Sequence, residues 1–388
     1  MTLSLSHGGT TMFRTAAPAQ AILLGTMDGV QILKKSATGQ WQHDGKGLAG
    51  RHIQAIHEVP GGIVFACAYR DGVYASEDGG VTWSPRDSGI GIRNVYSLAH
   101  AVIDGRVRLF AGTEPAHLYC SDDLGQSWSE LKAFRDIPNV GEWKFVATPF
   151  TGHTKHINID PKDPLTMYVC VEVGALLKTT DGGRTWKSIP VSNPDMHRTV
   201  IDPRDTRRVY TTGGAGLLFT SDEGRNWREL LPRMTNAVGQ YADQLVARAD
   251  NPDIMLVAAS QVSPRTWIDT KYAGAAVAKS TDGGETFRLL RGGLPERITA
   301  SIEALCQVES PAGVEYFFGT TDGEIWYGDQ DGERWTMIAT AAPVSKCIHQ
   351  EMLTGKPVTE MVHLDGVKRP YAEAAAAAAA PGSATPQA

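Results

Sequence analysis

Short apolar runs, rich in β-branched and aromatic residues, recur along this chain, and turns that contain Gly separate them. Runs of this length and composition are typical of β-strands. Several are paired around a turn, as in FACAYRDGVYAS and YVCVEVGALLKTT, which predicts hairpins. The pattern therefore predicts an all-β fold of many short strands.

An eight-residue pattern follows many of these hairpins: Ser or Thr, any residue, Asp, any residue, Gly, any residue, Ser, Thr or Asn, and an aromatic residue. It occurs at 76–83, 121–128, 179–186, 220–227 and 280–287, and weaker copies end at Trp41 and Trp335. The terminal aromatic residues are 41 to 60 positions apart. The shorter separations match one four-stranded propeller blade, and the longer ones predict insertions.

The residue types in this pattern suit a tight turn. An Asp carboxylate accepts backbone N–H bonds across a turn, and Gly adopts the positive φ that such a turn requires. The aromatic side chain is expected to pack between neighbouring blades. These chemical roles are structural, so we do not assign the repeated Asp residues, Asp78, Asp123, Asp181, Asp222 and Asp282, to catalysis.

The repeats resemble the Asp-box, or bacterial neuraminidase repeat, of sialidases, xyloglucan-degrading enzymes, a photosystem II assembly factor and sortilin-type receptors. The resemblance covers about residues 20–355 and implies a seven-bladed β-propeller in which each box joins the two outer strands of a blade. It implies little about activity, because one fold hosts many functions. A typical sialidase is not expected, since the Arg triad and the N-terminal motif of that family are not found.

Residues 20–355 are predicted to form the propeller, with extensions at 1–19 and 356–388, the latter ending in a low-complexity Ala-rich tail. Blade one lacks an obvious innermost strand, and the C-terminal run 346–353 is predicted to supply it and close the ring. The other inner strands are expected at 51–59, 93–102, 155–160, 197–202, 243–250 and 300–308.

Composition narrows the expected partners. The formal net charge is −6 and the basic residues are scattered, so nucleic acid is not an expected partner. No run reaches the roughly 20 apolar residues of a membrane span, and no signal peptide is visible, so a cytoplasmic protein without membrane contact is expected. The five Cys residues are widely spaced, which argues against a thiolate zinc site.

Ligands of propellers usually bind at one mouth of the channel, where inner strands begin. Aligned inner strands place polar residues there, including several imidazoles. Divalent-metal ligands are expected at His52, His156, His349 and Glu303. Catalytic roles are expected for His156, Arg198, Tyr96 and Glu303, and substrate contacts for Asn94, Asn158, His197, Gln244, Trp267 and Tyr272. Glu114 and Glu172 are interpreted as exposed hairpin residues, although Glu172 or Asp243 remains a candidate partner of Glu303 in glycoside hydrolysis.

Two classes of function remain open. The first is a hydrolase or lyase that acts on a carbohydrate-like or other small polar substrate, with help from one divalent metal ion and no organic cofactor. The second is a non-catalytic propeller that binds a ligand or a protein partner. Bound metal would favour the enzyme.

Overall fold

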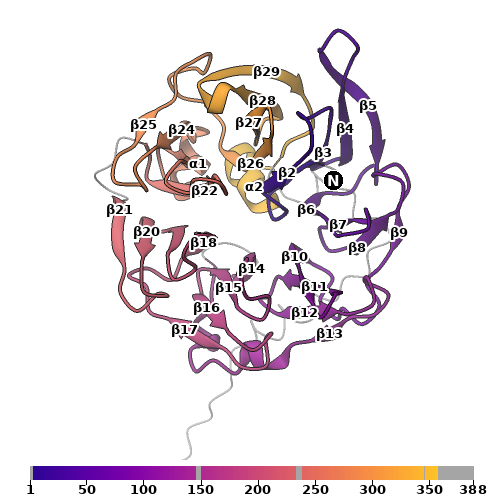
Figure 1. Cartoon of the computed structure of the whole chain (residues 1–388), viewed down its shortest axis with the longest axis vertical. Coiled ribbons are helices and arrows are strands. Elements are labelled where there is room, and N and C mark those ends of the chain that lie inside the picture. Colours follow the sequence, from indigo (N-terminus) through magenta and orange to yellow (C-terminus); the bar gives the residue numbers. More distant parts are fainter. Residues whose placement is uncertain (1–2, 146–149, 233–237, 345, 357–388) are drawn as a thin grey trace, which may run out of the picture.

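The computed structural model describes residues 3–145, 150–232, 238–344 and 346–356 of the 388-residue chain. Seven β-sheets surround a central axis like the blades of a propeller (Figure 1). Six of the sheets have four strands and the seventh has five. The prediction of an all-β, seven-bladed propeller is confirmed.

In each blade the strands follow one another outward in chain order. The inner strands of blades one to seven are β1 (Ser4–Leu5), β6 (Ile53–Glu58), β10 (Val95–Ile103), β14 (His153–Ile159), β18 (Met196–Ile201), β22 (Tyr241–Ala247) and β26 (Ile302–Ser310). The second strands are β3 (Ala21–Thr26), β7 (Val64–Ala68), β11 (Arg106–Thr113), β15 (Met167–Glu172), β19 (Val209–Gly213), β23 (Met255–Ser260) and β27 (Gly313–Thr320). Six of the seven predicted inner strands are confirmed.

The outer half of each blade is a second hairpin, and a few short helices complete the fold. The third strands are β4 (Gly29–Lys35), β8 (Gly72–Ser76), β12 (Leu118–Ser121), β16 (Ala175–Thr179), β20 (Gly216–Thr220), β24 (Ala275–Ser280) and β28 (Glu324–Asp329). The outer strands are β5 (Trp41–Gly47), β9 (Ser84–Pro85), β13 (Ser129–Glu130), β17 (Lys187–Ile189), β21 (Arg228–Pro232), β25 (Arg288–Leu289) and β29 (Arg334–Thr340). The helices are α1 (Pro264–Thr270), α2 (Cys347–Thr354) and the 3-10 turns η1 (Lys132–Arg135), η2 (Val140–Glu142) and η3 (Gln330–Gly332).

The repeated octapeptide forms the same turn between the third and outer strands in blades two to six. In blade two, Asp78 accepts the backbone N–H of Thr82 at 2.9 Å, and Ser76 Oγ accepts the N–H of Gly80 at 2.8 Å. Gly80 has a φ of 98°, which a side chain would strain. The equivalent carboxylates make the same bonds at Asp123, Asp181, Asp222 and Asp282. These Asp residues therefore act locally, as the sequence predicts.

The ring is closed by the N-terminal segment, residues 3–15, and this differs from the prediction. β1 pairs in parallel with β3 of blade one, and β2 (Met12–Arg14) pairs in parallel with β26 of blade seven. Between them, Gly8 donates its N–H to Gln54 O at 2.8 Å. The prediction that residues 1–19 lie outside the ring is therefore wrong, because this segment lies in the channel and bonds to the exposed edges of inner strands.

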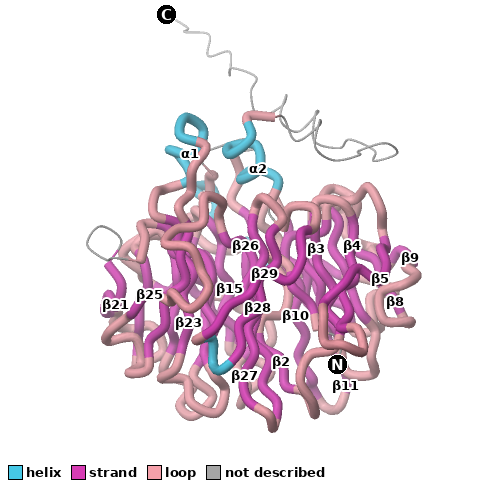
Figure 2. Tube along the Cα trace, turned by 90° about the horizontal axis from the view of Figure 1, so that it is seen from above, coloured by secondary structure: helices cyan, strands magenta, loops and turns pink. Residues whose placement is uncertain are grey.

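The predicted inner strand at 346–353 is also wrong, because these residues form α2. Their apolar residues, in KCIHQEML, are spaced for a helix as well as for a strand, and Gly355 ends the helix with a φ of 72°. Figure 2 shows α2 together with α1 on one face of the propeller. We call the channel end on this face the helical mouth. The predicted C-terminal extension lies outside the described residues, apart from residue 356.

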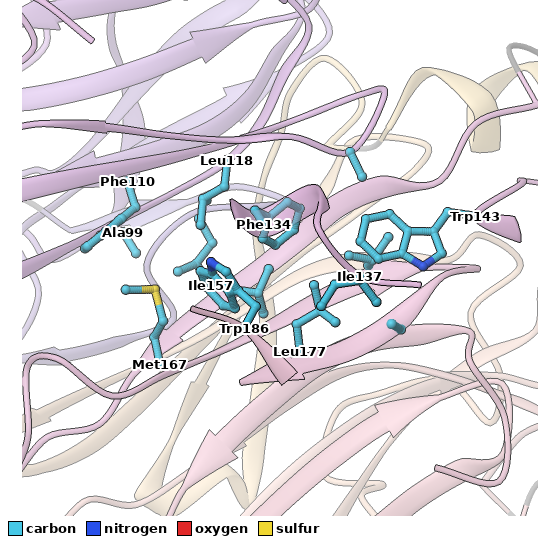
Figure 3. Packing of buried hydrophobic residues seen from close by; sticks show 14 of the residues in the cluster. Ala99, Phe110, Leu118, Phe134, Ile137, Trp143, Ile157, Met167, Leu177 and Trp186 are labelled. Carbon is cyan, nitrogen blue, oxygen red and sulfur yellow. The ribbon is translucent and has the colours of Figure 1, made fainter. Parts of the chain in front are cut away.

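Apolar side chains from adjacent blades form the core. Between blades three and four, the insertion before β14 adds Phe134, which has no exposed surface and lies edge-on to Trp143 and Trp186 at 5.8 and 5.2 Å (Figure 3). Trp143 is buried as well, so this insertion is anchored in the core rather than standing free at the rim. Within the described residues, no helix is long and apolar enough to cross a membrane.

The close passage of the N-terminal segment generates a testable prediction. A Cβ atom added at Gly8 would lie 2.0 Å from the carbonyl oxygen of Tyr96, and one added at Gly9 would lie 2.2 Å from that of Ile56. We expect Gly8→Ala and Gly9→Ala each to lower the free energy of unfolding by about 1–3 kcal/mol, as overpacking does. Chemical denaturation measures this loss.

Gly141→Ala is the matched control, because nothing lies within 4 Å of the added Cβ atom there. Equal denaturation midpoints for the Gly8, Gly9 and Gly141 variants would contradict the close passage.

Candidate active site

A β-bulge occurs near the start of every inner strand in blades two to seven. The ladder with the second strand skips one residue in each of these blades. The skipped residues are Gln54, Tyr96, Lys155, His197, Asp243 and Glu303. A bulge re-aims a side chain and is common beside active sites. The six bulge residues are all buried, and most of them contact one another or the N-terminal segment at the helical mouth.

Glu172, at the end of β15, lies at the centre of these contacts. Lys346 Nζ lies 2.7 and 2.6 Å from its two carboxylate oxygens, and Tyr241 OH donates to Oε1 at 3.1 Å. Burial alone would raise the pKa of Glu172, but the ammonium groups of Lys155 and Lys346 outweigh this effect and hold the pKa well below its usual value. Glu172 is therefore a buried, ionised carboxylate.

A second carboxylate, Asp243, is paired with Lys155 from the bulge of blade four. The Lys155 ammonium lies 2.5 Å from Asp243 Oδ1 and 3.3 Å from Glu172 Oε2. Burial disfavours the ammonium, but Asp243 and then Glu172 raise the pKa of Lys155 above its usual value. The amide of Gln244 donates to the remaining Asp243 oxygen at 2.8 Å, so both oxygens of Asp243 have partners.

Glu303 forms a third group with two imidazoles that come from opposite ends of the chain. His349 of α2 contacts Glu303 Oε1 through Nδ1 at 2.6 Å, and His7 Nδ1 lies 3.4 Å from Oε2. Burial lowers the pKa of His349 to about 4, so this imidazole is neutral at pH 7. Trp267 of α1 is fully buried and lies edge-on to His349 at 4.9 Å. The two helices therefore cover the mouth.

Glu114 and Glu172 lie on opposite sides of one imidazole, that of His153. His153 Nε2 lies 2.5 Å from Glu172 Oε2, and Nδ1 lies 3.6 Å from Glu114 Oε1. Burial raises the pKa of Glu114 to about 8, and burial lowers that of His153 to about 4. At pH 7 the arrangement is thus a protonated carboxyl, a neutral imidazole and an ionised carboxylate in a row. We call these three residues the Glu–His–Glu row.

In sequence, this chain is similar to xyloglucanases over part of its length. No protein-family model matches it. It is 25% identical over 262 residues to a xyloglucanase of Paenibacillus sp, a match that covers 60% of this chain and 24% of that protein. It is 29% identical over 227 residues to a xyloglucanase of Acetivibrio thermocellus, covering 50% of this chain and 25% of that one. The chain thus spans about a quarter of the length of these relatives.

Solved structures show the same fold at lower identity. The GH74 xyloglucanase from Xanthomonas campestris has a TM-score of 0.63 and 19% identity, covering 88% of this chain and 56% of that chain. YCF48 bound to D1 peptide has a TM-score of 0.51 and 17% identity, covering 80% of this chain and 96% of that chain. At such identities the likeness shows the propeller fold alone.

The predicted metal ligands do not converge. His349 and Glu303 are in contact, but His52 packs on Tyr69, with ring centres 5.7 Å apart, and His156 Nδ1 accepts the N–H of Thr199 at 3.3 Å. Among the described residues, two groups have ligand atoms within 4.8 Å of one another. They are His7 with Asp243 and Glu303, and Glu172 with Asp195 and His197.

The other predicted site residues are divided between the mouth and its surroundings. Tyr96 stacks on His153 with ring centres 4.2 Å apart, and Asn94 donates to Glu114 at 2.6 Å. Arg198 donates through Nη2 to the carbonyl oxygen of His7, so it holds the N-terminal segment. Two more predicted contacts lie elsewhere: Asn158 bonds to Thr199 O, and Tyr272 bonds to Gln261.

Several central residues were not among the predicted site residues, and two were interpreted wrongly. Glu114 and Glu172 are buried, not exposed, because the inserted segments and α2 cover the hairpin connections that carry them. His7 lies in the segment that was predicted to be an extension outside the ring. Lys346 lies in the segment that was predicted to be an inner strand. His153 directly precedes the predicted inner strand 155–160, so extending that strand by two residues is the signal that would have found it.

The raised pKa of Glu114 predicts a pH dependence of stability. A carboxyl whose pKa is higher in the folded protein than in the unfolded chain contributes stability below the unfolded pKa, and that contribution is lost as pH rises toward the folded pKa. For Glu114 this interval runs from about 4.3 in the unfolded chain to about 8. We expect the wild-type protein to lose this contribution between pH 5 and 8, and Glu114→Gln to lose less.

Denaturant titrations at pH 5, 6, 7 and 8 check this expectation. Glu229→Gln, at an exposed position on β21, is the control and should follow the wild type. The same pH slope for Glu114→Gln and the wild type would show that Glu114 titrates normally.

Proposed function

We propose that this protein is a hydrolase that acts on a carbohydrate-like or other small polar substrate at the helical mouth. The observation that carries the proposal is the Glu–His–Glu row, in which two carboxyl groups have opposite pKa shifts. Two titratable groups with pKa values pushed apart are a pattern for an acid and a base in one site. Glycoside hydrolysis needs such a pair on either side of the scissile bond.

The row gives each group a role. Glu114 donates its proton to the leaving-group oxygen, and the ionised Glu172 accepts a proton from the attacking water. His153 donates its Nε2 proton to Glu172 and holds this carboxylate in place. After product release, Glu172 loses the proton that it accepted and Glu114 takes one up, both by exchange with water. The net reaction consumes one water and breaks one bond to oxygen.

The separation of the two carboxyl groups in the row bears on the anomeric configuration of the product. The imidazole ring and its contacts of 2.5 and 3.6 Å hold the two carboxyl groups farther apart than the roughly 5 Å of retaining enzymes, so we expect inversion, with the substrate bound alongside the row. Aromatic rings of Phe145, Tyr96 and Tyr241 line the same mouth and offer flat apolar surfaces to a sugar ring. The similarity to xyloglucanases supports a carbohydrate substrate.

Access to the row requires α2 to move. Lys346 precedes α2 and is paired with Glu172, and Gln350 of α2 bonds to the carbonyl oxygen of Thr321. Met352 packs with Tyr241 and Trp267. We propose that α2 opens to admit substrate and closes over it, which excludes water and strengthens the electrostatic interactions inside.

A lyase is less well supported than a hydrolase. An elimination needs a cation that holds a substrate carboxylate, and Arg198 was the predicted group. In the structure this side chain is buried and already donates to the carbonyl oxygen of His7. Hydrolysis by the Glu–His–Glu row does not require a contact between Arg198 and the substrate.

Activity assays test the proposal. Wild-type protein is incubated with xyloglucan, its oligosaccharides and chromogenic aryl glycosides, and released reducing ends are measured. Glu114→Gln, which keeps the neutral charge of Glu114 at pH 7, should retain the fold and lose activity by about 100-fold or more, the usual contribution of general acid catalysis. Proton NMR of the first product formed should show inversion at the anomeric carbon.

Glu229→Gln should remain fully active. Full activity of Glu114→Gln, or retention of the anomeric configuration, would contradict the roles given to the row. Glu172→Gln is a second variant, and its fold must be checked first, because removing one partner of buried charges costs about 3–5 kcal/mol.

A binding propeller is the second candidate, and a groove at the opposite mouth favours it. This groove, of about 350 Å³, is lined by apolar side chains that include Met12, Phe13, Val200 and Ile201. Apolar grooves of this size bind ligands or partner segments. Wild-type protein without turnover and without a thermal shift on any of the carbohydrates would favour this candidate over the hydrolase.

A further inference from the structure

The imidazole of His197 faces two carboxylate oxygens with one nitrogen and a backbone carbonyl with the other. Nδ1 lies 2.8 Å from the carbonyl oxygen of Ala242, while Nε2 lies 3.3 Å from Asp195 Oδ1 and 3.9 Å from Glu172 Oε1. The His197 side chain has no exposed surface. Among the described residues, neither Nε2 nor Asp195 Oδ1 has a partner with acceptable hydrogen-bond geometry.

The carbonyl contact determines which nitrogen carries the proton. A carbonyl oxygen only accepts, so His197 Nδ1 must be the N–H donor. In the neutral imidazole the Nε2 lone pair then points toward two carboxylates, which repel it. A metal-binding His characteristically donates its other N–H to a backbone carbonyl or carboxylate in this way.

We propose that His197 Nε2, Asp195 Oδ1 and Glu172 Oε1 bind a divalent first-row transition-metal ion. One imidazole and two carboxylates are a ligand set that such ions accept, with an open position left for water or substrate. Ligand atoms about 2.0–2.1 Å from a tetrahedral metal lie roughly 3.3–3.4 Å apart. The separations from Nε2 are 3.3 and 3.9 Å, and all three ligand atoms lie within 4.8 Å of one another, so the ligands must draw together to bind an ion.

The three ligands are held by the fold in advance of binding. His197 is the bulge residue of β18, and Tyr241 OH holds Glu172 Oε1. Asp195 is fixed through its main chain, because its N–H bonds to Asn193 Oδ1 at 2.9 Å and its carbonyl accepts the N–H of Gly214 at 2.7 Å. The Asp195 side chain is 27% exposed, which gives an ion a path from solvent.

The charges around the three ligands leave the site negative. Lys346 and Lys155 lie against Glu172, and Asp243 lies 3.7 Å from His197 Nδ1. Three carboxylates therefore face two ammonium groups when the imidazole is neutral. The other candidate group, His7 with Asp243 and Glu303, is buried at all three residues, so it lacks the partly exposed ligand that Asp195 provides here.

This proposal goes beyond the hydrolase and does not require turnover. The Glu–His–Glu row uses Oε2 of Glu172, while the metal ion uses Oε1 and would keep the carboxylate ionised. The result of a metal-binding measurement is therefore independent of the result of the activity assay. Glu114→Gln should lose activity and keep the metal.

The test uses full-length protein dialysed against a chelator and titrated with Co²⁺ and Zn²⁺. We expect one equivalent of Co²⁺ to produce visible d–d absorption and one equivalent of Zn²⁺ to displace it. Asp195→Asn, at the partly exposed ligand, and His197→Gln should each weaken Zn²⁺ binding at least 10-fold. His117→Gln is the matched control, since His117 forms another imidazole–carboxylate contact, with Glu130, and should bind as the wild type does.

Histidine NMR of the metal-free protein gives a second readout. A neutral His197 protonated at Nδ1, whose Nε2 resonance shifts on adding Zn²⁺, supports the proposal. Less than stoichiometric binding by the wild type, or binding unchanged in both Asp195→Asn and His197→Gln, overturns it. So does an imidazolium at pH 7 that Zn²⁺ does not displace, because a proton then satisfies the two oxygens.

Discussion

The N-terminal segment occupies the axis of the propeller, and its contacts with blades one, two, five and seven connect the ring to the site. Two parallel pairings, β1 with β3 and β2 with β26, join the first and last blades through one continuous stretch of chain. The same stretch places His7 beside Glu303 and gives Arg198 its acceptor. The segment passes within van der Waals distance of neighbouring backbones at Gly8 and Gly9. A substitution in this segment therefore affects both the closure of the ring and the arrangement of the buried charges.

At the helical mouth, the protonation state of each buried carboxyl group depends on its charged neighbours. Glu172 is ionised because Lys155 and Lys346 lie against it, and Glu114 stays protonated because burial outweighs the effect of Lys346 and Arg70. Burying several ions is costly unless each has a partner. The outcome is a site in which neighbouring carboxyl groups differ in protonation at neutral pH, and this difference is what makes acid and base roles available together.

The blades were predictable from sequence because their signals are local. The repeat turn is complete within eight residues, as at Asp78, so hydrogen bonds and glycine conformations can be read without tertiary information. The closing strand was not predictable in this way. β1 is two residues long and pairs in parallel without a turn, whereas 346–353 carries apolar residues that fit either a strand or a helix.

The site was predicted in part, and a register error explains the remainder. In the predicted inner strands, Gln54, Tyr96 and Glu303 are the fourth residue, whereas Lys155, His197 and Asp243 are the first, although all six are equivalent bulge residues. Apolar patterning indicates where a strand lies but not which residue begins it, so the two sets of predicted strands differ in register by three positions. Burial of Glu114 and Glu172 depends on α2 and distant loops, which no local pattern indicates.

The position of the N-terminal segment also sets an order of events during synthesis. Residues 3–15 emerge from the ribosome before the seven blades, yet β2 has its partner in β26, which is made almost 300 residues later. At typical rates of about 5–20 residues per second, the segment waits on the order of tens of seconds for that partner. Until then the ring is open, and β2 and the first blades wait without the strand that closes it. Exposed strand edges of this kind are where nascent chains pair wrongly, so the last blade to be translated protects the first.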